Sequence, residues 1–205
     1  MANDNIPRGL VPLNWPSLPV HYYRVSTGAD LFLGMPVTLA AHGYIGPVAD
    51  VASAGAVRSI GVVVGFAGVL KRGLATNDPY LDVSDLTPPT PSSDTGDRWV
   101  AVADDPNQEF VMQEDTGGTA LALADAGLAI AGLYRASSGN TDTGWANLEI
   151  DADSGVASNS GAFLLLRLHD LVNSDGTENA VGDYAKWVVQ LLHHQKRSGI
   201  NPIPA

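Results

Sequence analysis

The sequence of 205 residues contains no cysteine. This absence excludes a disulfide framework, a thiolate metal site and a cysteine nucleophile. Long apolar runs are also missing, and the longest fall well short of the roughly 18 residues that a membrane-spanning helix requires. The opening residues, MANDNIPRG, contain no basic region followed by an apolar region, so we expect no secretory signal. We therefore expect no membrane partner, and a fold stabilised by burial, hydrogen bonding or assembly.

Basic residues are scarce, since 11 Lys and Arg face 22 Asp and Glu and give a net charge of −11. Phosphate binding requires clustered Lys and Arg, so we expect no direct nucleic-acid binding. The acidic residues concentrate in residues 73–183, whereas residues 1–72 and 184–205 are mildly basic. Such ends could dock on an acidic surface while the acidic body repels its own copies. Acidity that simply maintains solubility explains the composition equally well.

Recognisable catalytic and metal-binding motifs are absent from the sequence. It contains no HxH, HExxH, GxSxG, phosphate-loop or GxGxxG pattern. His193 and His194 are adjacent, so on a strand they point to opposite faces and cannot bind one metal ion together. Residues 151–155 begin like a calcium loop but lack the glutamate at its twelfth position. Two carboxylate pairs fit turns or a solvated surface: Asp104 with Asp105, and Glu114 with Asp115. We predict a protein that is not an enzyme and has no catalytic residue, metal site or cofactor.

The clearest structural pattern lies in residues 31–70, which read as a meander of short strands. Its second half alternates, with bulky apolar side chains on one face and Gly61 and Gly65 on the other. Glycine does not favour an isolated strand, so these two positions predict close backbone approach or bending. Upstream, a strand is expected from Val37, then a turn at residues 43–47 and a third short strand at residues 48–51.

The rest of the chain shows further short strands separated by turn signals. Residues 98–103 and 109–113 flank the sequence DDPN and predict a hairpin. Residues 119–133 contain either a helical turn ended by Gly127 or a loop between two strands; helix propensity favours the turn. The remaining strands are expected at residues 21–25, 145–150, 163–171 and 184–194. About nine or ten short strands predict an all-β fold, a single sandwich or barrel with extended N- and C-terminal arms.

The composition divides the chain into three parts. Residues 1–20 form a proline-rich arm that should be extended and should lie along either its own domain or a neighbouring subunit. Residues 21–195 form a β-rich domain, and residues 196–205 form a C-terminal tail. Within the domain, the core meander of residues 31–70 is followed by an exposed loop at 71–97 and a second strand set at 98–195.

Several stretches resemble the head decoration (cement) proteins of tailed bacteriophages. They are the opening MANDNIPRGLVPL, the turn Gly34-Met35-Pro36-Val37 followed by Ile60-Gly61-Val62-Val63, the segment VAVADDPNQEFVMQED, and the late strand AKWVV. The resemblance spans most of the chain, and residues 98–205 read as an addition to the shared core. It implies a non-enzymatic protein, made in the host cytoplasm and bound on the capsid exterior of the virion. There it would clamp adjacent major capsid subunits, often as a homotrimer.

On this reading the two ends of the chain supply the contacts to the major capsid protein or to other subunits. Trp15 is the expected anchor of the arm, and a solvated charged surface is the alternative for the two basic residues of the tail. The candidate contact residues are Ile6, Pro7, Arg8, Leu10, Pro12, Leu13, Trp15, Pro16, Leu18, Lys196 and Arg197. The competing hypothesis is a host-facing carbohydrate-binding or tail-associated β-sandwich module, which predicts aromatic side chains exposed on loops.

Overall fold

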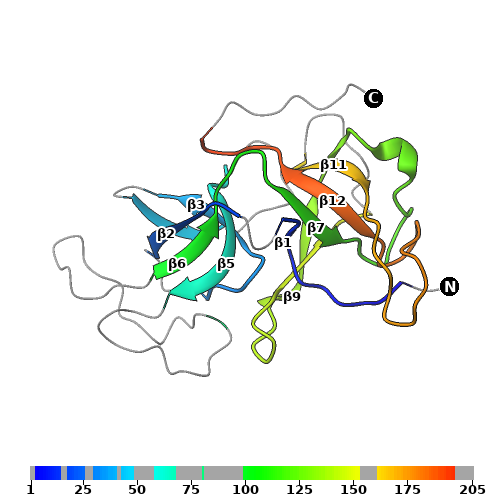
Figure 1. Ribbon diagram of the computed structural model, residues 1–205, viewed down its shortest axis with the longest axis horizontal. Helices are drawn as coiled ribbons and strands as arrows, with labels where there is room; N and C mark the ends of the chain where they lie inside the picture. Colours follow the sequence, from blue (N-terminus) through cyan, green and yellow to red (C-terminus); the bar gives the residue numbers. More distant parts are fainter. Residues whose placement is uncertain are drawn as a thin grey trace.

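The computed structural model describes residues 3–14, 18–25, 30–40, 43–48, 58–67, 80, 99–152 and 161–196. These residues form a closed five-stranded barrel, a five-stranded sheet and a two-stranded ribbon, and the barrel and the sheet lie side by side (Figure 1). The predicted all-β class is confirmed. The described residues contain twelve strands, more than the nine or ten expected, because two strands of only two residues leave little pattern in the sequence.

The barrel occupies the N-terminal half of the chain. Its strands are β2 (Val20–Val25), β3 (Pro36–Leu39), β4 (Tyr44–Pro47), β5 (Gly61–Ala67) and β6 (Trp99–Ala103). They follow the order β2-β4-β3-β5-β6, and β6 pairs back with β2 to close the barrel. The β2–β4 pair is parallel and the other pairs are antiparallel. Closure leaves the barrel without a free strand edge.

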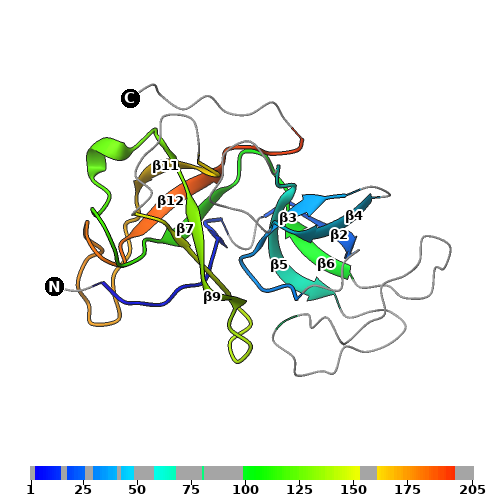
Figure 2. The same ribbon diagram turned by 180° about the vertical axis from the view of Figure 1, so that it is seen from behind.

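The second half of the chain, joined by β1 from the N-terminal arm, builds the antiparallel sheet and the ribbon (Figure 2). The sheet order is β1 (Val11–Pro12), β7 (Glu109–Gln113), β12 (Lys186–Leu191), β11 (Phe163–Leu168) and β8 (Ala129–Ile130). The ribbon pairs β9 (Gly132–Gly139) with β10 (Ala146–Ile150). A single 3-10 turn, η3 (Leu123–Asp125), precedes β8, and Gly127 follows it with a positive φ of 94°. The expected helical turn ended by glycine is therefore confirmed.

The hairpin predicted around the DDPN turn is wrong. β6 pairs with β2 and β5 in the barrel, whereas β7 pairs with β1 and β12 in the sheet. The turn therefore carries the chain from the barrel to the sheet. Turn residues specify a reversal of direction, but the pairing of the flanking strands depends on which partners bury their apolar sides. Val100 and Val102 are buried in β6, and Phe110 and Met112 are buried in β7.

The central meander is confirmed in part. Residues 43–47 were predicted as a turn, but Gly43 alone has a positive φ of 77° and β4 begins at the next residue. The close approach at Gly61 is confirmed, because a Cβ there would overlap the carbonyl oxygen of Ala103. The β5–β6 register shifts between Val63 and Gly65, which is the expected irregularity. The expected strand at 48–51 and the expected loop at 71–97 lie largely outside the described residues.

One contiguous apolar core extends through the barrel and the sheet. It includes Val62 and Val100 from the barrel, Phe110 and Trp187 from the sheet, and Leu10 from the N-terminal arm, all of them fully buried. The arm is fixed further where the Leu10 amide donates to the carbonyl oxygen of Gly34 over 2.9 Å. Within the described part of the arm, Leu10 therefore completes the core of its own chain.

Candidate functional site

Exposed apolar side chains gather at one end of the sheet. Ile6 on the N-terminal arm is 45% exposed, and Leu171, Val172 and Val181 on the segment after β11 are 38%, 62% and 44% exposed. These are four of the seven large apolar side chains that the described residues expose. A contiguous apolar surface on a protein marks an interaction site more often than scattered apolar residues do.

The arm and the segment after β11 are joined by hydrogen bonds into one surface, which we call the arm–loop face and define as residues 3–13 and 169–184. The Asn3 side chain donates to the carbonyl oxygens of Ala180 and Asp183 over 2.8 and 3.0 Å. The Asp4 carboxylate accepts from the Ser174 amide and hydroxyl over 2.6 and 3.0 Å. The face is therefore organised before any partner binds, which reduces the entropy lost on binding.

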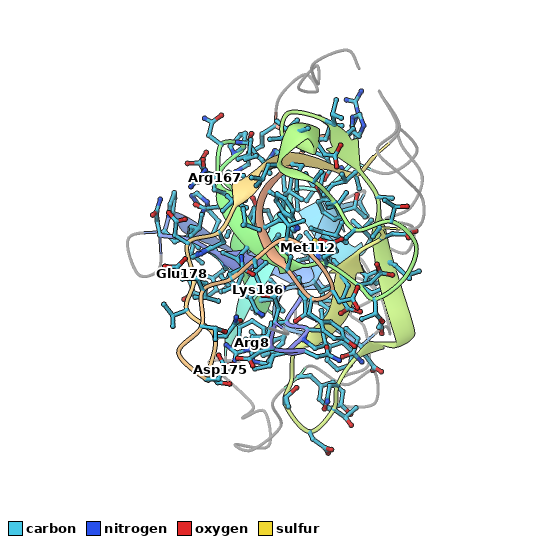
Figure 3. All side chains as sticks on the ribbon, turned by 90° about the vertical axis from the view of Figure 1, so that its right-hand side faces the viewer. Arg8, Met112, Arg167, Asp175, Glu178 and Lys186 are labelled. Carbon is cyan, nitrogen blue, oxygen red and sulfur yellow. The ribbon has the colours of Figure 1, made fainter. Side chains whose placement is uncertain are left out.

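A groove of about 380 Å³ runs between the arm and the sheet. Its floor is the outer side of the sheet, with Val111 and Gln113 from β7 and Lys186 from β12. The arm and residues 169–172 form its walls, which include Ile6 and Leu171. Figure 3 views the molecule from the side of this face, with Lys186 near the centre and Arg8 below it. The groove therefore combines apolar walls with cationic groups.

Lys186 is unusual because its side chain is charged and yet only 9% of the residue is exposed. Its ammonium donates to the carbonyl oxygen of Asp4 over 2.8 Å. Burial lowers the pKa of Lys186, the nearby Asp4 carboxylate raises it, and the Arg8 guanidinium lowers it again, with a net lowering. A buried ammonium next to a second cation is a position where an added anionic group would be favourable.

The structure places the predicted contact residues in different environments. Ile6 and Arg8 are exposed on the arm–loop face, and Pro7, Leu13 and Leu18 are partly exposed. Leu10 and Pro12 are buried, so their side chains support the fold of their own chain. Trp15, Pro16 and Arg197 lie outside the described residues. Lys196 lies beyond the far end of β12 from Lys186, so it is not part of the arm–loop face.

Lys196 instead belongs to a polar cluster around the buried carboxylate of Asp104. His21 Nδ1 lies 2.7 Å from one oxygen, and the Tyr23 hydroxyl and the Lys196 ammonium both donate to the other. Burial alone would raise the pKa of Asp104, but the hydrogen bonds from Lys196, Tyr23 and His21 outweigh it and hold the pKa below its ordinary value. Because all three side chains contact this one carboxylate, the cluster links β2 to Lys196. Sequence reasoning missed it, since the partners lie far apart along the chain.

The second carboxylate pair, Glu114 with Asp115, was expected in a turn or on a solvated surface. Both residues are buried instead. Glu114 is fully buried, and its two oxygens accept from the Leu121 amide and from Nε1 of Trp187, each over 2.8 Å. Next to it, Gln113 Nε2 donates to Glu149 over 2.7 Å, while Gln113 Oε1 accepts from the Ile6 amide over 2.8 Å. This network links the arm to the interior of the sheet.

The described residues hold neither a cluster of metal ligands nor a membrane-spanning helix. No group of three or more His, Asp or Glu side chains in the described ranges could hold a metal ion. Within the same part of the chain, no helix has the length and apolar character needed to cross a bilayer. Residues 153–155 of the calcium-like segment lie outside the described residues.

No protein-family model, curated protein or solved structure matches this chain.

Proposed function

We propose that this chain is a non-enzymatic structural protein that binds a larger assembly through the arm–loop face. The observation that carries the proposal is the gathering of Ile6, Leu171, Val172 and Val181 on one hydrogen-bonded surface. Burying such side chains against a partner contributes about 25 cal/mol per Å² of apolar area removed from water. An arm already fixed to its own domain loses little further entropy when it docks.

The particular assembly that we propose is the capsid of a tailed bacteriophage. The protein would bind the capsid exterior as a decoration protein, clamp adjacent major capsid subunits and stabilise the head, with a homotrimer as the proposed bound form. The resemblance of the opening MANDNIPRGLVPL and of the later stretches to cement proteins supports this choice. The location of Ile6 and Arg8, both from that opening stretch, on the exposed face also supports it.

The positions of the aromatic side chains favour this proposal over a carbohydrate-binding module. Sugar-binding platforms require an aromatic ring with an open face. The described tryptophans are otherwise occupied: Trp187 is buried, Arg24 lies over the Trp99 ring at 5.0 Å, and Arg8 lies over the Trp145 ring at 5.8 Å. Tyr22 on β2 is the exposed aromatic side chain that the alternative would use.

Co-sedimentation with expanded heads of the virus that encodes the chain, prepared without this protein, tests the proposal. Val172→Lys places a charge in the apolar face, and we expect it to weaken binding at least tenfold. Leu123→Lys is the matched control, because Leu123 is 64% exposed on η3 and Val172 is 62% exposed. We expect this control to bind as the wild type does. Wild-type binding by both Val172→Lys and Ile6→Lys would show that the arm–loop face is not the docking surface.

Failure of the wild-type protein to sediment with the heads would contradict the capsid assignment itself. Light scattering of the full chain, free and bound, measures whether the bound form is a trimer. Resistance of the heads to heat or to chelators, with and without the protein, measures the proposed stabilisation.

A further inference from the structure

We propose that the groove of the arm–loop face binds an extended polypeptide segment that carries a single carboxylate between apolar side chains. The inference names the chemical class of the partner that docks on this face. It relies on the proposed function for the assembly from which that partner comes. It rests on three observations: the course of the groove, the cationic groups inside it, and the location of four of the face's five acidic side chains outside it.

The groove follows the N-terminal arm over most of its length. Its lining includes Asp4, Ile6 and Arg8, which alternate along the arm as side chains sharing one side of an extended backbone do. It then continues along the arm to Leu13 beside β1. Figure 1 shows the arm running from the outer end of the sheet to β1. Ten residues in extended conformation span at most about 35 Å, so the groove suits another extended chain.

The cationic groups inside the groove define the charge of its ligand. The Lys186 ammonium has three donors, and within the described part of the chain its one hydrogen bond is to the Asp4 carbonyl oxygen. Arg8 lines the same groove and lies close enough to lower the pKa of Lys186. The carboxylate of Asp4 is occupied by Ser174. A ligand carboxylate would therefore find the buried Lys186 ammonium with unused donors and the exposed Arg8 guanidinium, opposed in the groove lining by the Asp4 carboxylate alone.

Four of the five acidic side chains of the face lie outside the groove, and the fifth, Asp4, lines it with its carboxylate bound by Ser174. Asp170, Asp175, Glu178 and Asp183 belong to the segment after β11, but none of them lines the groove. Asp175 accepts from the Thr177 amide and hydroxyl over 2.9 and 2.6 Å. These carboxylates would repel a segment with many acidic residues, whereas they leave room for one carboxylate flanked by apolar side chains. Attraction of one carboxylate inside the groove and repulsion of further carboxylates outside it together give specificity for the ligand segment.

The test uses the full chain and three seven-residue peptides that alternate valine and threonine and carry a central Glu, Gln or Lys. Acetylated and amidated ends leave the central side chain as the peptide's one charge. Binding is measured by calorimetry and by ¹⁵N chemical shifts of Ile6, Val111 and Val172. We expect the glutamate peptide to bind about tenfold more tightly than the glutamine peptide, and the lysine peptide to bind least. Equal affinity of the three peptides, or no binding of any, would overturn the inference.

Lys186→Met keeps the length of the side chain and removes its charge. We expect it to reduce the preference for the glutamate peptide over the glutamine peptide at least threefold, with the apolar part of the binding retained. Lys196→Met is the matched control, because Lys196 contacts Asp104 and not the groove, and it should keep the full preference. If Lys186→Met does not fold, Arg8→Gln at an exposed position serves instead and should reduce the preference at least threefold.

Sodium acetate separates a peptide groove from a simple anion site. Acetate at tens of millimolar should leave peptide binding almost unchanged, because it fills none of the apolar walls. Displacement of the glutamate peptide at that concentration would show a small-anion site and contradict the polypeptide ligand. Because these measurements use no viral heads, a positive peptide result with negative co-sedimentation would refute the capsid assignment alone.

Discussion

Nε1 of Trp187 donates a hydrogen bond of 2.8 Å to the carboxylate of Glu114, and both residues are fully buried. Burial raises the pKa of Glu114, the hydrogen bonds from Leu121 and Trp187 lower it, and Asp115 and Asp183 raise it, with a net increase above the ordinary value of 4.5. A carboxyl with a raised pKa stabilises the fold most when it is protonated. Its contribution is therefore complete below the unfolded-state value and is lost as the pH rises through the folded-state value.

Glu114→Gln should remove this pH dependence. An amide has one acceptor oxygen, so one of the two buried donors loses its partner and stability falls by about 1–3 kcal/mol. The difference in unfolding free energy between wild type and variant should shrink as the pH rises from about 4 to about 7. Urea denaturation across that range measures it. If the unfolding free energies of the two proteins changed with pH in parallel, the raised pKa of Glu114 would be contradicted. Trp187→Phe removes a hydrogen bond that lowers this pKa, so it should enlarge the loss of stability with rising pH.

Asp104→Asn should destabilise the fold most at neutral pH, whereas Glu114 stabilises it most at low pH. The hydrogen bonds that lower the pKa of Asp104 stabilise the native state above the ordinary value of 3.8, and this contribution is lost as the pH falls through the depressed folded value. We expect a loss of about 1–3 kcal/mol at neutral pH, limited because His21 and Lys196 are partly exposed. Urea denaturation at neutral and acidic pH should show that the difference in unfolding free energy between wild type and variant becomes smaller at low pH.

Asp105→Asn is the control for this measurement. Asp105 accepts from the Asn107 amide over 2.8 Å in an exposed turn, and an asparagine oxygen can accept the same bond. The variant should unfold within about 0.5 kcal/mol of wild type. A similar loss in both variants would mean that the turn, and not the buried cluster, determines the effect.

Gly61→Ala should be far more damaging than Gly65→Ala, although both glycines lie in β5. At Gly61 a Cβ would overlap backbone and side-chain atoms of Ala103 and Val102, so β5 and β6 would have to separate. At Gly65 the nearest atom is the Ala101 Cβ, 3.6 Å away, which is an ordinary contact. We expect a loss of about 1–3 kcal/mol for the first and little change for the second. Thermal unfolding of the two variants measures the difference, and equal melting temperatures would contradict the tight packing of this barrel seam.

Local patterns predicted the strands but not their partners. The strand expected at residues 184–194 is present as β12, and Trp187, Val189 and Leu191 of this strand lie in the core. The same kind of pattern at residues 98–113 suggested a hairpin, yet its two strands join different sheets. Pairing is determined by contacts between residues far apart in the sequence, and nothing local in a strand encodes them.

The candidate site shows the same division. Composition identified the N-terminal arm as an apolar segment that must lie along something, and the structure shows that Leu10 lies in its own core. The exposure of Leu171 was not visible, because this residue ends the stretch 163–171 that reads as a buried strand, and Val172 lies just beyond that stretch. β11 ends at Leu168, and only the tertiary structure shows that the run leaves the core there.

The sequence by itself determined the all-β class, the positions of most strands, the absence of thiol chemistry and the need for close packing at Gly61. These follow from side-chain periodicity, composition and the absence of a Cβ, which are local properties. The tertiary structure decided that a closed barrel and an open sheet share one core. It also decided that Asp104 and Glu114 are buried, and that Lys186 lies in a groove beside Arg8. Each of these depends on residues about 70 to 180 positions apart, which only the folded chain brings within hydrogen-bonding distance.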